Sequence, residues 1–155
     1  MKPWIDGLTD RGFEGAAVQL PRSSAERAML AYRAAAPPGP LAVIGGHSFG
    51  GRVASLLAAD EEYAGLILLS YPLHRPGHPE TVNARTAHWS RISCPVLLLS
   101  GESDPFARVG LLRDAIAKLP DAELVTYPAA RHGLSAVRAD ALDRIAVWLR
   151  KLAVG

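Results

Sequence analysis

The residues that could do chemistry in this chain lie in three short segments. The first is Gly46-His47-Ser48-Phe49-Gly50, which fits the pattern G-x-S-x-G. In such a pattern the serine lies at a tight turn from a strand into a helix, and the glycines let the two elements approach each other. A serine hydroxyl becomes a good nucleophile only when a neighbouring base takes its proton. The pattern therefore predicts Ser48 as a nucleophile and requires a base elsewhere in the chain.

The other two segments supply an acid and a base in the required order. Asp104 follows one apolar run, and His132 follows the next. Where a serine of this kind lies between a strand and a helix, the acid comes later in the chain and the histidine last, each in a loop after a later strand. The carboxyl ends of parallel strands meet at one edge of a sheet, so the three side chains are expected to converge. Glu102 is a rival acid, and it ranks second because it lies nearer the end of its strand.

Each of these residues also has an ordinary interpretation. Ser48 could be a turn serine, Asp104 a turn-forming aspartate before Pro105, and His132 a solvated loop histidine. Placement decides between the two interpretations. Three chemically matched side chains follow three separate apolar runs in the expected order, and this agreement favours the chemical interpretation over three unrelated turns.

The neighbours of the nucleophile have predicted roles too. The backbone N–H of Phe49 lies at a helix N-terminus, where it can stabilise an oxyanion. His47 is expected to pack at the rim of a substrate pocket, and Tyr71 and His74 begin an irregular segment that is expected to shape that pocket. Arg52, in the first turn of the helix, is expected to be an ion-pair or surface residue, although it could also contact an anionic group.

Apolar runs of strand length alternate with helical patterns along the chain, as in a parallel sheet covered on both faces. The strands are expected at residues 16–20, 41–44, 66–69, 96–99 and 124–127. The helices are expected at residues 24–36, 49–59, 107–119 and 139–152. These elements predict an α/β fold of three layers with about five mostly parallel strands, in one domain that spans residues 1–155.

Composition excludes several classes of function. The net charge is only +2, and the basic residues are scattered, so no nucleic-acid partner is expected. No apolar run is long enough to span a membrane. No metal or other cofactor is expected, because His74, His78 and His88 lack the spacing of a zinc site. The one cysteine, Cys94, is interpreted as a buried inert thiol, and with no internal disulfide the expected location is the cytoplasm.

Taken together, three strings resemble the small α/β-hydrolase family related to dienelactone hydrolases. They are Gly45 to Ser55, the string Ser70-Tyr71-Pro72-Leu73-His74, and Gly101 to Phe106. The resemblance covers nearly the whole chain. It implies a doubly wound sheet and a catalytic triad of Ser48, Asp104 and His132, but it implies no particular substrate.

The interpretation that follows is a serine hydrolase acting on a small acyl substrate, with carboxylic esters as the expected class. The alternative is a non-catalytic binding or scaffold protein that keeps the hydrolase fold, and transfer of the acyl group to an acceptor other than water is a third possibility. No residue pattern indicates the oligomeric state.

The resemblance also implies a strand and a glycine-rich turn upstream of Met1. That strand would lie between residues 16–20 and 41–44, and its turn would provide the second oxyanion donor. We therefore expect Met1 to be an internal methionine. Without the strand, residues 16–20 and 41–44 must pair directly or leave backbone groups unpaired.

Overall fold

The computed structural model describes residues 1–36 and 39–154. Its sheet has four parallel strands, which lie side by side in chain order. They are β1 (Val43–His47), β2 (Gly65–Leu69), β3 (Val96–Gly101) and β4 (Ala122–Tyr127). The helices are α1 (Lys2–Thr9), α2 (Ala25–Ala35), α3 (Phe49–Asp60), α4 (Val82–Thr86), α5 (Val109–Ala115) and α6 (Arg138–Val154). Short 3₁₀ turns are η1 (Pro79–Thr81), η2 (Trp89–Arg91), η3 (Ile116–Lys118) and η4 (Ser135–Val137).

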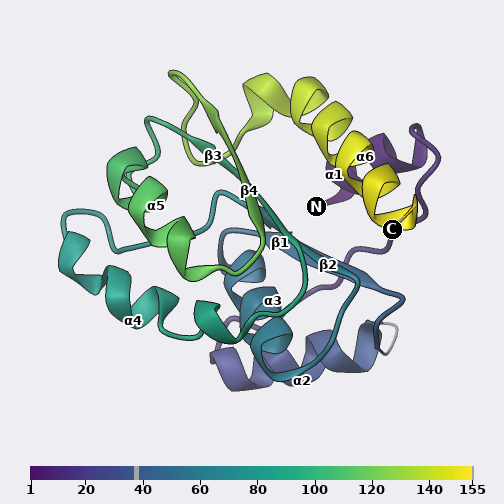
Figure 1. Ribbon diagram of the computed structural model, residues 1–155, viewed down its shortest axis with the longest axis horizontal. Helices are drawn as coiled ribbons and strands as arrows, with labels where there is room; N and C mark the ends of the chain where they lie inside the picture. Colours follow the sequence, from purple (N-terminus) through teal and green to yellow (C-terminus); the bar gives the residue numbers. More distant parts are fainter. Residues whose placement is uncertain (37–38, 155) are drawn as a thin grey trace.

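Helices cover both faces of the sheet, which confirms the predicted three layers. Helices α1 and α6 lie on one side of the strands, and α2 to α5 lie on the other (Figure 1). Strand β3 is buried along its whole length. Its side chains alternate between the two cores: Val96 and Leu98 pack with α3 and α5, whereas Leu97 and Leu99 pack with α6. A strand buried on both faces must be apolar throughout, which explains the continuous run of leucines.

Local sequence signals place most of the helices. The hydroxyl of Ser24 accepts a hydrogen bond from the Arg27 N–H (3.2 Å) and caps α2. The apolar stripe of α6 buries Leu142, Ile145 and Trp148 against the sheet. Helix α1 was not predicted. It buries Trp4 in the same core cluster as the stripe of α6. Within the described part of the chain, no helix is both long and apolar enough to span a membrane.

The prediction of a first strand at residues 16–20 is wrong. This segment forms no strand, so the sheet has four strands rather than about five. Val18 and Leu20 are half-buried, while the residues between and before them are exposed. Their spacing is that of a strand, but among the residues that the structure describes no neighbouring strand provides the backbone partners that a strand requires. The next strand is also shifted, because Leu41 is 94% exposed and β1 starts at Val43.

Strand β1 pairs with β2 alone among the described residues, so it lies at one edge of the sheet. The Ser48 N–H donates to the Leu69 carbonyl (2.9 Å), so the backbone of Ser48 faces β2. Alternate residues of a parallel strand face the same neighbour, and the backbone N–H and C=O of Gly45 therefore point away from β2. The hydroxyl of Tyr32 fills this position. It donates to the Gly45 carbonyl (2.7 Å) and accepts from the Gly45 N–H (2.9 Å). A side chain of α2 thus takes the place of a strand at this point.

Candidate active site

The nucleophile candidate lies at a strained turn between β1 and α3. Ser48 has φ 51° and ψ −116°, a left-handed conformation that is rare for a residue with a side chain. The turn brings strand and helix so close that a Cβ added to Gly46 would lie 2.4 Å from the carbonyl carbon of Gly50. The first glycine of the pattern is therefore required by close packing. The second is not, because the nearest atom to a Cβ on Gly50 is 4.0 Å away.

Loops after β3 and β4 bring an acid and a base to this serine. The Nε2 atom of His132 lies 2.8 Å from the Ser48 Oγ, and its Nδ1 atom lies 2.8 Å from the Asp104 Oδ2. A carboxylate can only accept, so Nδ1 carries the proton and Nε2 is free to accept from the serine hydroxyl. The structure thus brings the three predicted residues together in one chain of hydrogen bonds.

The acid of this chain is held on both oxygens. Asp104 is only 4% exposed, and its Oδ1 accepts from the Phe106 N–H (2.8 Å) while Oδ2 faces His132. Glu102, the rival acid, lies elsewhere. Its carboxylate pairs with Arg113 (3.2 Å) and accepts from the Thr126 hydroxyl (2.8 Å). Of the two carboxylates, only Asp104 hydrogen-bonds to the histidine.

Two rings hold the imidazole of His132 in place. The Phe106 ring lies 4.5 Å from it, and the His47 ring lies 5.1 Å from it, centre to centre. His47 also donates through Nε2 to the His132 carbonyl (2.8 Å), because a carbonyl can only accept. Burial lowers the pKa of His47, which favours its neutral form. The sequence predicted His47 at a rim and gave Phe106 no role, although Phe106 lies two residues after Asp104 in one of the strings that carry the family resemblance.

Backbone strain gathers at the same edge of the sheet. The non-glycine residues with positive φ in the described part of the chain are Ser48, Ser70, Ala129 and Leu134. Ser48 follows β1, Ser70 follows β2, and the other two flank His132 in the loop after β4. Residues in such conformations persist where the surrounding structure holds them, and they cluster at functional sites.

The N–H of Phe49 is available to a ligand. It is the first residue of α3, and it donates no hydrogen bond to any described residue. The N-terminus of a helix carries partial positive charge from aligned peptide dipoles. A developing oxyanion on a substrate bound to Ser48 would lie next to the Phe49 N–H and to the N-terminus of α3.

Tyr71 and His74 do not line an open pocket, contrary to the prediction. Tyr71 is fully buried, and its hydroxyl donates to the Arg85 carbonyl (2.7 Å). His74 is 1% exposed and uses both ring nitrogens, since Nδ1 donates to the Arg75 carbonyl and Nε2 accepts from the Arg108 N–H. The sequence shows that both residues have polar side-chain atoms. It does not show that these atoms form hydrogen bonds with backbone groups in the folded protein. His74 instead joins the segment after β2 to the loop that carries Asp104.

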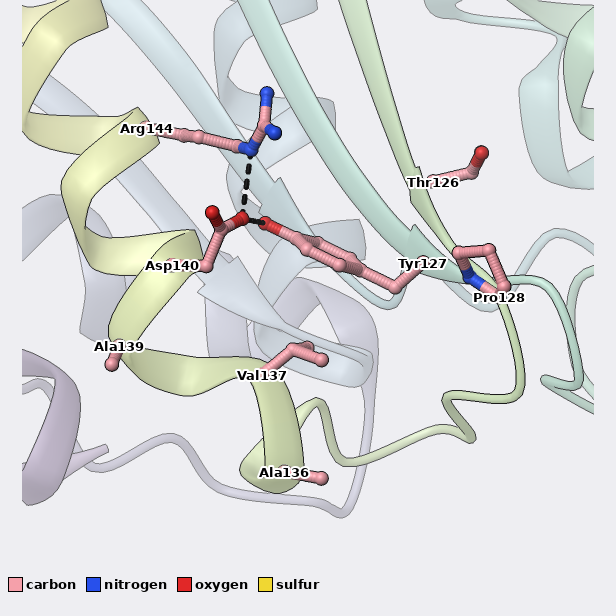
Figure 2. Close-up of a pocket in the computed structure, with 8 residues that line it drawn as sticks. All are labelled: Thr126, Tyr127, Pro128, Ala136, Val137, Ala139, Asp140 and Arg144. Atoms are coloured by element: carbon pink, nitrogen blue, oxygen red, sulfur yellow. Dashed lines mark hydrogen bonds and ion pairs between the residues drawn. The ribbon is translucent and has the colours of Figure 1, made fainter.

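A hollow of about 560 Å³ lies away from this site, between β4 and the start of α6. Figure 2 shows the Tyr127 hydroxyl and the Arg144 guanidinium both turned toward the carboxylate of Asp140. These polar groups satisfy one another, and none of them contacts Ser48 or His132 in the hydrogen-bond pattern. Across the described residues, no group of three His, Cys, Asp or Glu side chains is placed to hold a metal ion.

Comparison with known proteins agrees with this fold. The family described as alpha/beta hydrolase domain matches residues 21–152. A monoacylglycerol lipase from Paleococcus ferrophilus superposes with a TM-score of 0.76 at 16% identity, over 97% of this chain and 88% of that one. An esterase from Pyrococcus furiosus gives 0.70 at 16% identity, over 97% and 76%.

A third similar structure is much longer than this chain. It is an alpha-beta serine hydrolase homologue from Coxiella burnetii, with a TM-score of 0.56 at 19% identity. The match covers 69% of this chain and 48% of that protein, so the chain spans about half of its length. At these identities the solved structures establish a shared fold.

Proposed function

Because the chain belongs to the alpha/beta hydrolase family, we propose that it is a serine hydrolase that cleaves a carboxylic ester. The observation that carries this proposal is the pair of 2.8 Å hydrogen bonds from Ser48 through His132 to Asp104. A scaffold protein would not need a buried carboxylate, a histidine and a strained serine joined in one chain of hydrogen bonds. The esterase and lipase among the similar structures support the same class of reaction.

The proposed reaction follows from the positions of the protons. The Ser48 Oγ attacks the ester carbonyl carbon while its proton passes to Nε2 of His132. The carboxylate of Asp104 stabilises the resulting imidazolium and holds the ring in place. The negative charge on the carbonyl oxygen is stabilised by the Phe49 N–H and the N-terminus of α3. The intermediate expels the alcohol, which takes the proton from Nε2. Water then releases the acid by the same steps and restores the serine.

Two finer proposals accompany the reaction. We propose that the chain is one of the small hydrolases related to dienelactone hydrolases, which the Ser70 to His74 string and the elbow sequence resemble. We also propose the cytoplasm as its location. Cys94 is the one cysteine and it is buried, so the fold needs no oxidising compartment.

An ester screen tests the proposed function. Purified protein is assayed against p-nitrophenyl esters of increasing acyl length, beside the Ser48→Ala variant as a matched control. We expect hydrolysis by the wild type and only background hydrolysis by the variant. Equal rates for the two proteins, both folded by circular dichroism, would favour the scaffold alternative.

A further inference from the structure

Arg52 lies one helical turn after Ser48 on α3. Its N–H donates to the Ser48 carbonyl (3.0 Å), so the two residues lie on the same face of the helix. Side chains on a helix lean toward its N-terminus, which in α3 is the end next to Ser48. The axial separation of the two residues is about 6 Å at 1.5 Å per residue. The guanidinium of Arg52 is therefore within reach of a short molecule bound at Ser48.

A second arginine is attached to the same region through buried contacts. The Tyr71 hydroxyl donates to the backbone carbonyl of Arg85 on α4 (2.7 Å). On α3, the Ser55 hydroxyl donates to the Arg52 carbonyl (2.8 Å) and lies 2.8 Å from Nε2 of His88. The contact between Ser55 and His88 fixes η2 against α3, and the bond from Tyr71 fixes α4 against the segment that follows β2. Burial lowers the pKa of Arg85, and the positive charge of Arg52 lowers it further, so the two guanidinium groups act on each other.

Neither guanidinium has a partner within the part of the chain that the structure describes. Neither forms an ion pair or donates a hydrogen bond, and the Nε atom of Arg52 is shielded from solvent. Other arginines of the protein do pair with carboxylates: Arg11, Arg33, Arg91, Arg113 and Arg144. Two half-buried positive charges that repel each other are unfavourable unless an anion lies between them. Arginine is also the side chain best suited to grip a carboxylate with two parallel hydrogen bonds.

We propose that Arg52 and Arg85 bind a carboxylate carried by the ester substrate, so that the enzyme prefers anionic esters such as monoesters of short dicarboxylic acids. This inference rests on the proposed function, because it concerns the substrate bound at Ser48. The carboxylate would satisfy the unpaired guanidinium groups and hold the scissile carbonyl at a fixed distance from the serine. Arg75 is exposed, and its charge also acts on Arg85, so it adds to the positive field at the same place.

The test compares two esters with the same leaving group. One is the mono-p-nitrophenyl ester of glutaric acid, which carries a free carboxylate, and the other is p-nitrophenyl butyrate, which is neutral. The measured quantity is the ratio of their kcat/KM values in the wild type, Arg52→Gln and Arg85→Gln. Arg91→Gln is the matched control, because Arg91 lies on the neighbouring η2 and already pairs with Asp60 (3.5 Å).

We expect the wild type to favour the anionic ester and each of the two site variants to lower the ratio about 10- to 100-fold, as loss of a charged hydrogen bond implies. The control variant should keep the wild-type ratio. A wild type that cleaves the neutral ester at least as well, or site variants that keep its ratio, would overturn the inference and leave the proposed function standing. A second readout uses binding of glutarate by calorimetry, which needs no catalysis. If no ester is cleaved, glutarate binding that is lost in Arg52→Gln still supports the anion site, and absence of binding to the wild type overturns it.

Discussion

The two glycines of the G-x-S-x-G pattern should respond very differently to the same substitution. A Cβ on Gly46 would lie 2.4 Å from the carbonyl carbon of Gly50 and 2.7 Å from the N atom of Gly51. Both of these are backbone atoms in the first turn of α3, so no side chain can rotate away to relieve the contact. A Cβ on Gly50 meets only the end of the Leu20 side chain, at 4.0 Å. Gly46→Ala must therefore separate β1 from α3, whereas Gly50→Ala needs no movement.

The size of the difference follows from these distances. Overpacking a well-packed site costs about 1–3 kcal/mol, and we expect Gly46→Ala to reach at least the upper end because backbone must move. For a domain of this size that corresponds to a fall in Tm of about 6–12 °C. Gly50→Ala should lie between no change and a gain of about 1 kcal/mol, because it removes a glycine from a helix without strain.

Thermal unfolding followed by circular dichroism measures both variants against the wild type. A serine-reactive fluorophosphonate gives a second readout, since displacement of the elbow should reduce labelling of Ser48 in Gly46→Ala at temperatures where the variant is still folded. The reasoning is refuted if Gly46→Ala melts within about 2 °C of the wild type, or if Gly50→Ala is destabilised as much as Gly46→Ala.

Three further substitutions test separate parts of the structure. Asp104→Asn should lower kcat/KM for esters about 10³- to 10⁴-fold, because an amide cannot stabilise the imidazolium of His132; a loss below tenfold would contradict this role. Burial lowers the pKa of His88 to about 4, so as the pH falls from 6.5 to 4 the unfolded chain takes up a proton that the folded protein does not, and the folded protein loses up to about 3 kcal/mol. His88→Gln should remove most of this pH dependence in urea unfolding, and an unchanged slope would show that His88 is not its source. His74→Leu removes the acceptor for the Arg108 N–H and should lower the free energy of unfolding by about 1–3 kcal/mol, measured by urea; an equally stable variant would contradict the bridging role.

The sequence predicted most of the sheet because each strand carries its own signal. A parallel strand covered on both faces must be a continuous apolar run, and Val96 to Leu99 is such a run. The positions of Asp104 and His132 then follow from topology, since residues after parallel strands meet at one edge. These features depend on residues close together in the sequence, together with a general rule of the fold.

The errors arose where a feature depends on partners distant in the sequence. Val18 and Leu20 have the spacing of a strand, but only a neighbouring strand could make them one, and the described residues provide none. The hydroxyl of Tyr32 satisfies Gly45 across the open edge, an arrangement that no local pattern announces. Residue type predicts a pocket position for His74, yet both of its ring nitrogens form hydrogen bonds with backbone groups. Residue type shows what a side chain can do, and burial decides whether it is available.

The most direct test of the account is to label the protein with a fluorophosphonate and locate the adduct by mass spectrometry. The probe reacts with a serine only when a neighbouring base activates it. We expect one adduct on Ser48 in the wild type, none at that position in Ser48→Ala, and much slower labelling in His132→Ala. The assignment of Ser48 as the nucleophile would be contradicted if the folded wild type stays unlabelled. It would also be contradicted if the adduct lies on a different serine and forms equally fast in the wild type and in Ser48→Ala.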